Sequence, residues 1–506
     1  MPPFLASRPR SCSTVSDGQQ TVVGVLQHRA HTGGSRPFIA DGARWINYQE
    51  MWRLVCRGQH ALATRGVRPG DRVLIDSTIS PSQFVASYLA AHLNGTISVP
   101  LGGTGSAAAA YIADDTEAAF VIARDTYPLL FDRATGLENL DPKLPSPDQT
   151  ADILYTSGTT GRPKGVMLSH AAIYASTSAT NRFIGNGADD YEIVTVPLSH
   201  SFGLGRIRGV LMAGGRLSAV SMSLPGEAVT ALADPAVTGM SCVPAGIAIL
   251  QRWGEQELAA ASERLRYIEL GSSHMSADRK RLLAELLPAT RIIMHYGLTE
   301  ASRSCFLDLH GESDRLTSVG RPSPGVQLRI MDQDDAPIAA SGEGVIHIRS
   351  PAVMSGYWRN PAATARALSQ DGWLRTSDVG RLDEQGFLTL VGRLDDQINV
   401  GGKKVDPAAV EEAAIACEGV ADAGCVGISD PGDLVGQVPV LFIVESEGVN
   451  LDLPSLRRHL KARLEGHERP TRILVVRTLP KTETGKLKRA ELRRLLSSEQ
   501  ATSNEN

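Results

Sequence analysis

The chain has 506 residues, of which 42% are apolar and 21% are charged, and its formal net charge is −4. This length provides for two or more hydrophobic cores, and the weakly negative charge argues against a nucleic-acid-binding protein. Because no apolar run reaches the roughly 18 residues that a membrane helix requires, we expect no membrane span.

The ends and the cysteines give little functional information. We expect residues 1–20 to be a disordered N-terminus, although their Arg and Ser content also resembles that of a transit peptide, and residues 497–506 to be a disordered tail. The six cysteines show no CxxC pair and no metal-ligand spacing, which predicts reduced packing residues in a cytoplasmic protein. They are Cys12, Cys56, Cys242, Cys305, Cys417 and Cys425.

The first part of the chain alternates apolar strands with helices. Residues 72–75 and 120–122 read as strands, and residues 48–65 and 81–93 read as helices. Alternation of this kind indicates parallel sheets joined by crossover helices, which is the α/β fold class.

The second part changes in character twice. Closely spaced turns in residues 319–348 predict an antiparallel β subdomain. After Arg393, helices over 407–415 and 453–464 and an apolar strand over 438–444 predict a small α+β unit. We therefore expect a large N-terminal body of βα-layered subdomains over residues 21–394 and a C-terminal lid over residues 395–496.

The most informative run is Tyr155–Gly165, which reads YTSGTTGRPKG. Glycines let the backbone approach a ligand closely, hydroxyls donate hydrogen bonds and a lysine supplies a cation, so the run predicts a loop around the β and γ phosphates of ATP. A strand over 152–155 and a helix from Met167 onward would place the loop where α/β sheets bind anions. It is no Walker A loop, because Pro163 stands where that pattern needs Gly. The alternative is a flexible linker. The predicted phosphate-binding residues are Thr156, Ser157, Gly158, Thr159, Thr160 and Lys164.

Four further motifs follow in order, and with this loop they resemble the core motifs of the adenylate-forming superfamily. They read YGLTE over 296–300, SDVG over 377–380, GRLDD over 392–396 and LPKTETGK over 479–486. The superfamily comprises acyl-CoA synthetases, adenylation domains of peptide synthetases and beetle luciferase. The resemblance extends from about residue 35 to residue 496. It implies ATP-dependent activation of an organic carboxylic acid as an acyl-adenylate, followed by transfer to a thiol, with CoA as the expected acceptor.

The resemblance also implies catalytic roles for single residues. Lys486 resembles the mobile lysine that bridges the substrate carboxylate and the α-phosphate, where a compact cation suits the developing charge. Thr299 occupies the position that contacts the AMP phosphate, and Glu300 the position that holds Mg²⁺, a hard cation that takes oxygen ligands. The alternative for Lys486 is one more solvated lysine in a basic segment.

The nucleoside is assigned in the same way. Tyr296 would stack on adenine, with a core tyrosine as the alternative. Asp378 would accept both ribose hydroxyls, and Arg393 would also contact the ribose. Gly271 and Ser272 match the loop that lies between adenine and the acyl group.

In this family the lid turns between the two half-reactions. Asp395 occupies the hinge position, and Gly402 the position that borders the pantetheine tunnel, where a side chain would block the channel. Lys403 and Lys404 either meet CoA phosphates or an acidic carrier protein, or serve only solubility.

The expected substrate pocket is described less fully by the sequence. His200 resembles the residue that closes the acyl pocket, with a buried structural histidine as the alternative. No Asp is available to pair with an α-amine, which disfavours amino acids. If Arg206 points inward, it would bind an acid or a hydroxyl at the distal end of the substrate; otherwise it reaches the surface. The expected pocket residues are His200, Phe202, Arg206, Gly271 and Gly297.

Three other functions share these motifs. A stand-alone adenylating enzyme would load the phosphopantetheine of an acidic carrier protein instead of CoA. A luciferase-like enzyme would depend on oxygen. A catalytically dead nucleotide-binding protein would be expected to lack Lys486 or Glu300, and both residues are present.

Overall fold

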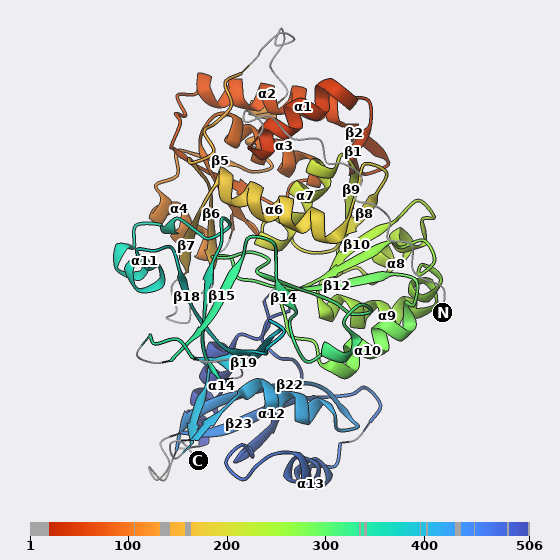
Figure 1. The fold of residues 1–506 in the computed structure, drawn as a ribbon, viewed down its shortest axis with the longest axis vertical. Coiled ribbons are helices and arrows are strands. Elements are labelled where there is room, and N and C mark those ends of the chain that lie inside the picture. Colours follow the sequence, from red (N-terminus) through yellow and green to blue (C-terminus); the bar gives the residue numbers. More distant parts are fainter. Residues whose placement is uncertain are drawn as a thin grey trace.

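The computed structural model divides into a large N-terminal body and a smaller C-terminal lid, which lies at one end of the long axis (Figure 1). It describes residues 20–105, 107–131, 142–156, 163–332, 335–338, 342–394, 396–400, 403–430, 437–449, 451–482 and 485–503. The predicted disordered N-terminus lies almost wholly outside these ranges.

The first sheet of the body has the strand order β17-β7-β6-β4-β3-β5. Strands β3, β4, β5 and β6 run parallel, whereas β7 and β17 are antiparallel additions at one edge. The strands are β3 (Arg72–Asp76), β4 (Ile97–Leu101), β5 (Phe120–Ile122), β6 (Thr150–Thr156), β7 (Lys164–Ser169) and β17 (Gly356–Tyr357).

The second sheet has nine strands in the order β14-β13-β12-β11-β10-β8-β9-β1-β2. Its centre, from β1 to β12, is parallel, and β2, β13 and β14 are antiparallel. The strands are β1 (Pro37–Asp41), β2 (Arg44–Asn47), β8 (Tyr191–Val194), β9 (Arg216–Ala219), β10 (Gly239–Cys242), β11 (Tyr267–Leu270), β12 (Arg291–Tyr296), β13 (Cys305–Asp308) and β14 (Arg321–Pro322).

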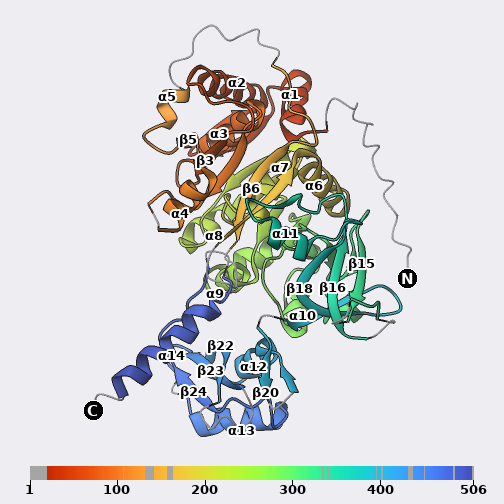
Figure 2. The same ribbon diagram turned by 90° about the vertical axis from the view of Figure 1, so that its left-hand side faces the viewer.

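Helices pack around and between these sheets (Figure 2). Two of them begin with a capping box, in which side chain and backbone groups bond reciprocally: Asn47 with Glu50, and Ser80 with Gln83. The helices of the body are α1 (Val22–Gly33), α2 (Tyr48–Thr64), α3 (Pro81–Leu93), α4 (Ala107–Thr116), α5 (Tyr127–Phe131), α6 (His170–Ile184), α7 (Ser201–Ala213), α8 (Pro225–Ala233), α9 (Pro244–Ala260), α10 (Ala277–Leu286) and α11 (Pro361–Ala367).

The predicted antiparallel subdomain is a four-stranded sheet in the order β15-β16-β18-β19. All its pairings are antiparallel, and in the last of them Asp378 lies opposite Arg393. The strands are β15 (Gln327–Met331), β16 (Gly344–Arg349), β18 (Leu374–Leu382) and β19 (Leu388–Arg393). This register brings two predicted nucleotide residues side by side.

The lid contains a two-stranded and a three-stranded sheet with helices, as the α+β prediction requires. Its elements are β20 (Ile398–Val400), β21 (Lys403–Val405), α12 (Pro407–Ile415), β22 (Val420–Ser429), β23 (Gln437–Glu445), α13 (Leu453–Arg463), β24 (Arg472–Val475) and α14 (Arg489–Ser503). Helix α14 continues past residue 497, where we predicted the tail to begin. The mixed parallel sheets and this small terminal unit confirm the predicted fold class.

One local prediction was wrong. Met167 lies in strand β7, which pairs antiparallel with β6, and the helix begins only at His170. The side chains of Val166 and Leu168 are buried, and Ser355 N bonds to the carbonyl of Met167, so tertiary pairing fixes an extended conformation here. The glycine-rich run therefore connects two strands of a hairpin and does not begin a helix.

The described cysteines fit the packing prediction. Cys56, Cys242, Cys305 and Cys425 are buried free thiols, and Cys417 is half-buried. Among the residues that the structure describes, no helix is both long and apolar enough to cross a bilayer.

Candidate active site

The predicted nucleoside residues meet at the edge of the antiparallel sheet. Tyr296 ends strand β12, and its hydroxyl donates a hydrogen bond of 2.7 Å to Asp378 Oδ2. The other carboxylate oxygen lies 3.1 Å from Arg393 Nε. Burial and the adjacent Asp378 raise the pKa of Tyr296 well above its ordinary value, so the phenol stays protonated and acts as a donor. Two residues from strands β12 and β19 thus meet the carboxylate of Asp378 on β18.

Lys486 of the lid is affected by the charges of the same site. It follows Gly485, whose positive φ of 78° suits glycine, in a turn that is closed by the bond from Thr482 N to Lys486 O. Desolvation and the guanidinium of Arg393 lower the pKa of Lys486, whereas Asp378 raises it. The lysine therefore lies within the electrostatic influence of the Asp378–Arg393 pair, and we call Tyr296, Asp378, Arg393 and Lys486 the interdomain cluster.

Further contacts connect the lid with the body. His274 Nε2 lies 3.9 Å from Glu412 Oε2, and Arg252 Nη2 lies 2.5 Å from Glu447 Oε2. All four side chains are more than half exposed. Pairs of this kind stabilise weakly.

The predicted metal residue Glu300 is oriented by its neighbours. The hydroxyl of Tyr357 donates to Glu300 Oε1 at 2.9 Å, and Lys164 lies 5.5 Å from the centre of the same tyrosine ring. No group of three or more His, Cys, Asp or Glu side chains among the described residues could hold a metal ion. The single carboxylate of Glu300 fits Mg²⁺ that arrives with nucleotide phosphates, because Mg²⁺ takes one or two carboxylates and fills its other positions with phosphate and water.

Only the two ends of the predicted phosphate loop are described. Thr156 closes β6 and pairs with Lys164 at the start of β7. The predicted residues Ser157, Gly158, Thr159, Thr160, Asp395 and Gly402 lie outside the described part of the chain.

The glycines of the predicted acyl site are required by close approaches. A Cβ on Gly271 would lie 2.2 Å from the ring of His295, and one on Gly297 would lie 2.3 Å from the backbone nitrogen of Arg303. Ser272 and Arg303 adopt positive φ values of 71° and 55°. Non-glycine residues in this region are strained, and such strain gathers at functional sites.

The predicted pocket residues His200 and Phe202 lie at the start of helix α7. His200 is its N-cap, and the ring of Phe202 meets His295 edge-on with 4.7 Å between ring centroids. The guanidinium of Arg303 lies over the ring of Phe202, with its central carbon 5.3 Å from the ring centroid. His295 and Arg303 therefore belong to this site, although the sequence analysis did not single them out.

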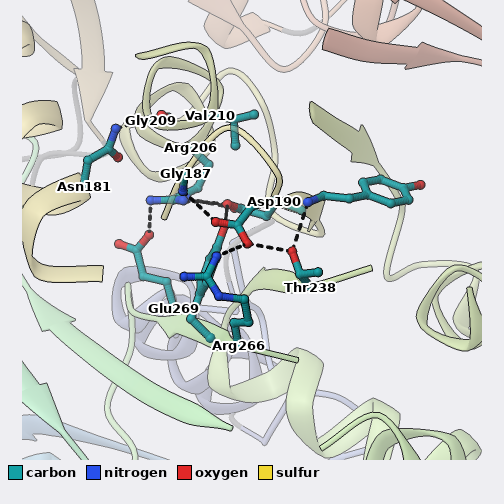
Figure 3. A network of polar contacts seen from close by, with 12 residues as sticks. Asn181, Gly187, Asp190, Arg206, Gly209, Val210, Thr238, Arg266 and Glu269 are labelled. Carbon is teal, nitrogen blue, oxygen red and sulfur yellow. Dashed lines mark hydrogen bonds and ion pairs between the residues drawn. The ribbon is translucent and has the colours of Figure 1, made fainter. Parts of the chain in front are cut away.

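Arg206 does not point to the substrate. It is fully buried and makes a forked contact with Glu192, through Nε at 2.8 Å and Nη2 at 2.5 Å. Its Nη1 lies 2.9 Å from Glu269 Oε2 (Figure 3). The guanidinium of Arg206 is already paired with protein carboxylates on both sides, so it is not available to bind a substrate acid. Arg206 does not reach the surface either.

The carboxylate of Glu269 joins further charges to this pair. Its Oε1 lies 2.8 Å from Arg303 Nε and 2.9 Å from His295 Nδ1. Although burial raises the pKa of Glu269, the guanidiniums of Arg303 and Arg206 hold it below its usual range. We call Glu192, Arg206, Glu269, His295 and Arg303 the buried charge cluster.

A sequence signal for this cluster existed. Glu192 and Glu269 interrupt the apolar strands YEIV and YIEL, in which every residue is buried. A carboxylate in a buried strand needs a cationic partner, so the two acids and the arginines of α7 could have been paired. The sheet order, which places β10 between β8 and β11, was needed to show that both acids face one helix.

The comparisons with known proteins agree with this geometry. Residues 26–358 match the family model "AMP-binding enzyme", and residues 409–486 match "AMP-binding enzyme C-terminal domain". The chain belongs to the AMP-binding enzyme family. The two matches cover parts of the body and of the lid, including Tyr296 and Lys486 of the interdomain cluster, whereas Asp378 and Arg393 lie between the matched ranges.

Curated relatives of this family are similar over nearly the whole chain. A feruloyl-CoA synthase from Amycolatopsis sp is 31% identical over 92% of this chain and 97% of that protein. A 2-succinylbenzoate–CoA ligase from Geobacillus kaustophilus is 31% identical over 94% and 98%. These relatives place the chain among AMP-forming acid–thiol ligases.

A solved structure supports the nucleotide assignment. The o-succinylbenzoate coenzyme A synthetase of Bacillus subtilis, in complex with ATP and magnesium ion, has a TM-score of 0.80 and 25% identity, and covers 93% of this chain and 99% of that one. This similarity supports ATP and Mg²⁺ as ligands of the present chain.

Proposed function

We propose that this enzyme activates an organic carboxylic acid with ATP and Mg²⁺ and transfers the acyl group to CoA, and that its predicted site residues other than Arg206 act in the roles given above. The observation that carries the proposal is the interdomain cluster, in which the charges of Asp378 and Arg393 of the body shift the pKa of Lys486 of the lid, and Asp378 pairs with Arg393 at 3.1 Å. A lysine that belongs to a separate domain would supply positive charge to the nucleotide site in one orientation of the lid. In another orientation it would lie away from the site.

In the first half-reaction, a carboxylate oxygen of the acid bonds to the α-phosphorus of ATP, and the bond from that phosphorus to pyrophosphate breaks. Lys486 would neutralise the charge on the attacking carboxylate and the α-phosphate, while Thr156 and Lys164 hold the phosphates to be released. Glu300 would hold Mg²⁺, which neutralises phosphate charge. Asp378 and Arg393 would fix the ribose.

In the second half-reaction, a thiol sulfur attacks the acyl carbon, AMP leaves with the bonding electrons, and the thiol proton passes to solvent. In this step Lys486 would be withdrawn from the site so that the thiol can enter. The lid must therefore turn, and the exposed pairs between His274 and Glu412 and between Arg252 and Glu447 would break. Asp395 and Gly402 remain the proposed hinge and tunnel residues.

CoA is proposed as the acceptor because the curated relatives are named as CoA ligases. Lys403 is exposed on β21, which suits either the phosphates of CoA or an acidic carrier protein. A cytoplasmic location also remains a proposal.

The test is pyrophosphate release from ATP and Mg²⁺ across fatty, aryl, hydroxy, dicarboxylic and amino acids, each with and without CoA, with mass spectrometry of the thioester. We expect one class of acid to react and CoA to increase turnover. Adenylate formation that CoA does not accelerate would favour a carrier protein as acceptor, and pyrophosphate release with none of the acids would contradict the function.

A further inference from the structure

Strand β12 places a histidine beside the expected acyl site. The strand reads RIIMHY, and His295 interrupts its run of apolar and aromatic side chains. In the parallel pairing of β11 with β12, Glu269 lies beside Ile293. Side chains two residues apart in a strand point to the same face of the sheet, so Glu269 and His295 share one face. Helix α7 packs on this face, because its Arg206 contacts Glu269 (Figure 3) and its Phe202 contacts His295.

The imidazole of His295 lies between two of the predicted pocket residues. On one side is Gly271, the first residue after β11, where an added Cβ would lie 2.2 Å from both Cε1 and Nε2 of the ring. A glycine is therefore needed for the ring to lie here. On the other side the ring meets Phe202 edge-on, with 4.7 Å between centroids. His295 thus occupies the space between the loop at Gly271 and the start of α7, the two elements expected to form the acyl pocket.

The ring of His295 is also anchored. Its Nδ1 lies 2.9 Å from Glu269 Oε1, and the side chain is only 7% exposed. Glu269 is itself held by Arg303 Nε at 2.8 Å and Arg206 Nη1 at 2.9 Å. A carboxylate fixed by two buried arginines cannot follow a rotating imidazole, and loss of a polar contact in a buried place is costly. The ring therefore keeps its position and does not make way for a bulky ligand.

We infer, on the basis of the proposed function, that His295 is a specificity-determining residue that limits how far the acyl group extends between Gly271 and Phe202, and that the enzyme therefore prefers acids with a short acyl group. A longer chain or a second ring would have to displace an imidazole that Glu269, Gly271 and Phe202 hold in place. Close-packed protein interiors do not absorb extra volume without strain. One methylene more or less in an apolar pocket changes discrimination by about 10- to 200-fold.

The first test uses acids that differ in length alone. The aliphatic series is butanoate, hexanoate, octanoate and decanoate, and the aryl series is benzoate, 4-methylbenzoate, 4-ethylbenzoate and 4-butylbenzoate. The readout is kcat/KM for CoA-dependent pyrophosphate release by the unmodified enzyme. In each series that reacts, we expect the longest acid to be used at least about tenfold less well than the better of the two shortest. Equal or better use of the longest acid would overturn the inference and leave the ligase function intact.

The second test removes the ring. His295→Ala should raise the ratio of kcat/KM for the longest acid to that for the shortest by at least about tenfold, because the space that the imidazole fills becomes available to the acyl group. Burial lowers the pKa of His295, so the ring is uncharged at neutral pH and the substitution removes volume without removing charge. Glu269 keeps both of its arginine partners in this variant. An unchanged ratio in the folded variant would overturn the inference.

Two further variants separate the size of the ring from its polar contact. His295→Phe keeps a ring of at least the same size and loses the nitrogen beside Glu269, so the ratio should stay as in the unmodified enzyme. A rise as large as that of His295→Ala would mean that the contact with Glu269 sets the preference, and would overturn the argument from size. His60→Ala, on the exposed face of α2, is the control and should leave the ratio unchanged.

The outcomes remain distinguishable if a variant is unstable or no acid reacts. Thermal unfolding shows whether His295→Ala is folded, and His295→Asn, which is also smaller but keeps a polar group, takes its place if it is not. Failure of the unmodified enzyme to release pyrophosphate with any of these acids, or with the wider panel, would contradict the proposed function itself. A working ligase that uses long and short acids equally well would contradict only the role of His295.

Discussion

The protein contains two groups of charged residues that look alike in the sequence but differ in the structure. In the buried charge cluster, Arg206 meets carboxylates on both sides within the body and has no exposed surface. In the interdomain cluster, Asp378 meets Arg393 and Tyr296, but the nearby cation Lys486 belongs to the lid. The first group is complete within one domain, whereas the second depends on where the lid lies. The difference separates charges that hold the fold from charges that serve the reaction.

The largest effect is expected from breaking the complete cluster. Arg206→Ala would leave Glu192 and Glu269 buried with fewer partners, and removal of one member of a buried ion pair costs about 3–5 kcal/mol of stability. Urea unfolding of the full chain measures this loss. Arg281→Ala, which breaks an exposed pair with Asp278 on α10, is the matched control and should change stability by less than about 0.5 kcal/mol. A marginal effect of Arg206→Ala would show that the cluster does not hold the body together.

The next effect concerns the reaction and not the fold. Lys486→Ala should lower adenylate formation by about 10²- to 10³-fold, as loss of one well-placed donor to a developing charge does. It should largely spare the thiolation of a supplied acyl-adenylate, because the lysine serves only the first lid orientation. Lys488→Ala, two residues further on and paired with Glu491, is the control and should affect neither step. Equal loss in both half-reactions would argue against two working orientations.

A smaller effect is expected when the carboxylate of the interdomain cluster loses its charge. Asp378→Asn should weaken ATP binding by about 10- to 100-fold, because hydrogen bonds to a charged group contribute about 1.5–3 kcal/mol. Isothermal titration with a non-hydrolysable ATP analogue measures the change, and thermal unfolding should shift little. Asp383→Asn, in the turn between β18 and β19, removes a half-exposed carboxylate and should leave nucleotide binding intact. ATP affinity that is the same in both variants would exclude Asp378 from the ribose site.

The smallest effect is expected at the exposed pairs between lid and body. Arg252→Ala breaks the contact with Glu447, and such pairs contribute about 0.2–1 kcal/mol. The rate of adenylation should change less than about fivefold, and the thiolation rate should not fall. Single-turnover measurements of the two half-reactions test this, with Glu447→Gln as the partner variant. A strong loss of adenylation would mean that this contact holds the lid in place.

The interdomain cluster could be predicted from the sequence because each of its residues lies in a short contiguous motif. Each residue is recognised from the motif residues next to it, many of them glycines. This holds for Tyr296, Asp378, Arg393 and Lys486. The buried charge cluster could not be predicted in this way, since its members come from β8, β11, β12, α7 and the segment between β12 and β13, and meet only through the sheet order. Arg206 was misassigned for that reason.

The phosphate loop shows the same limit at short range. Its composition indicated contact with phosphate, but the strand that follows it is fixed by pairing with β6 on one side and with the distant segment β17 on the other. The composition of a loop can therefore indicate its chemistry, but it does not determine whether the segment after the loop is a strand or a helix.

The turn that carries Lys486 has one further consequence. Leu479 is buried in the lid core, a bridge joins Lys481 to Leu487, and Gly485 has a positive φ, so the segment around the lysine is anchored to the lid. In the proposed mechanism, the lid rotation that withdraws this cation would also open the path for the thiol. One movement of the lid would then set the order of the two chemical steps.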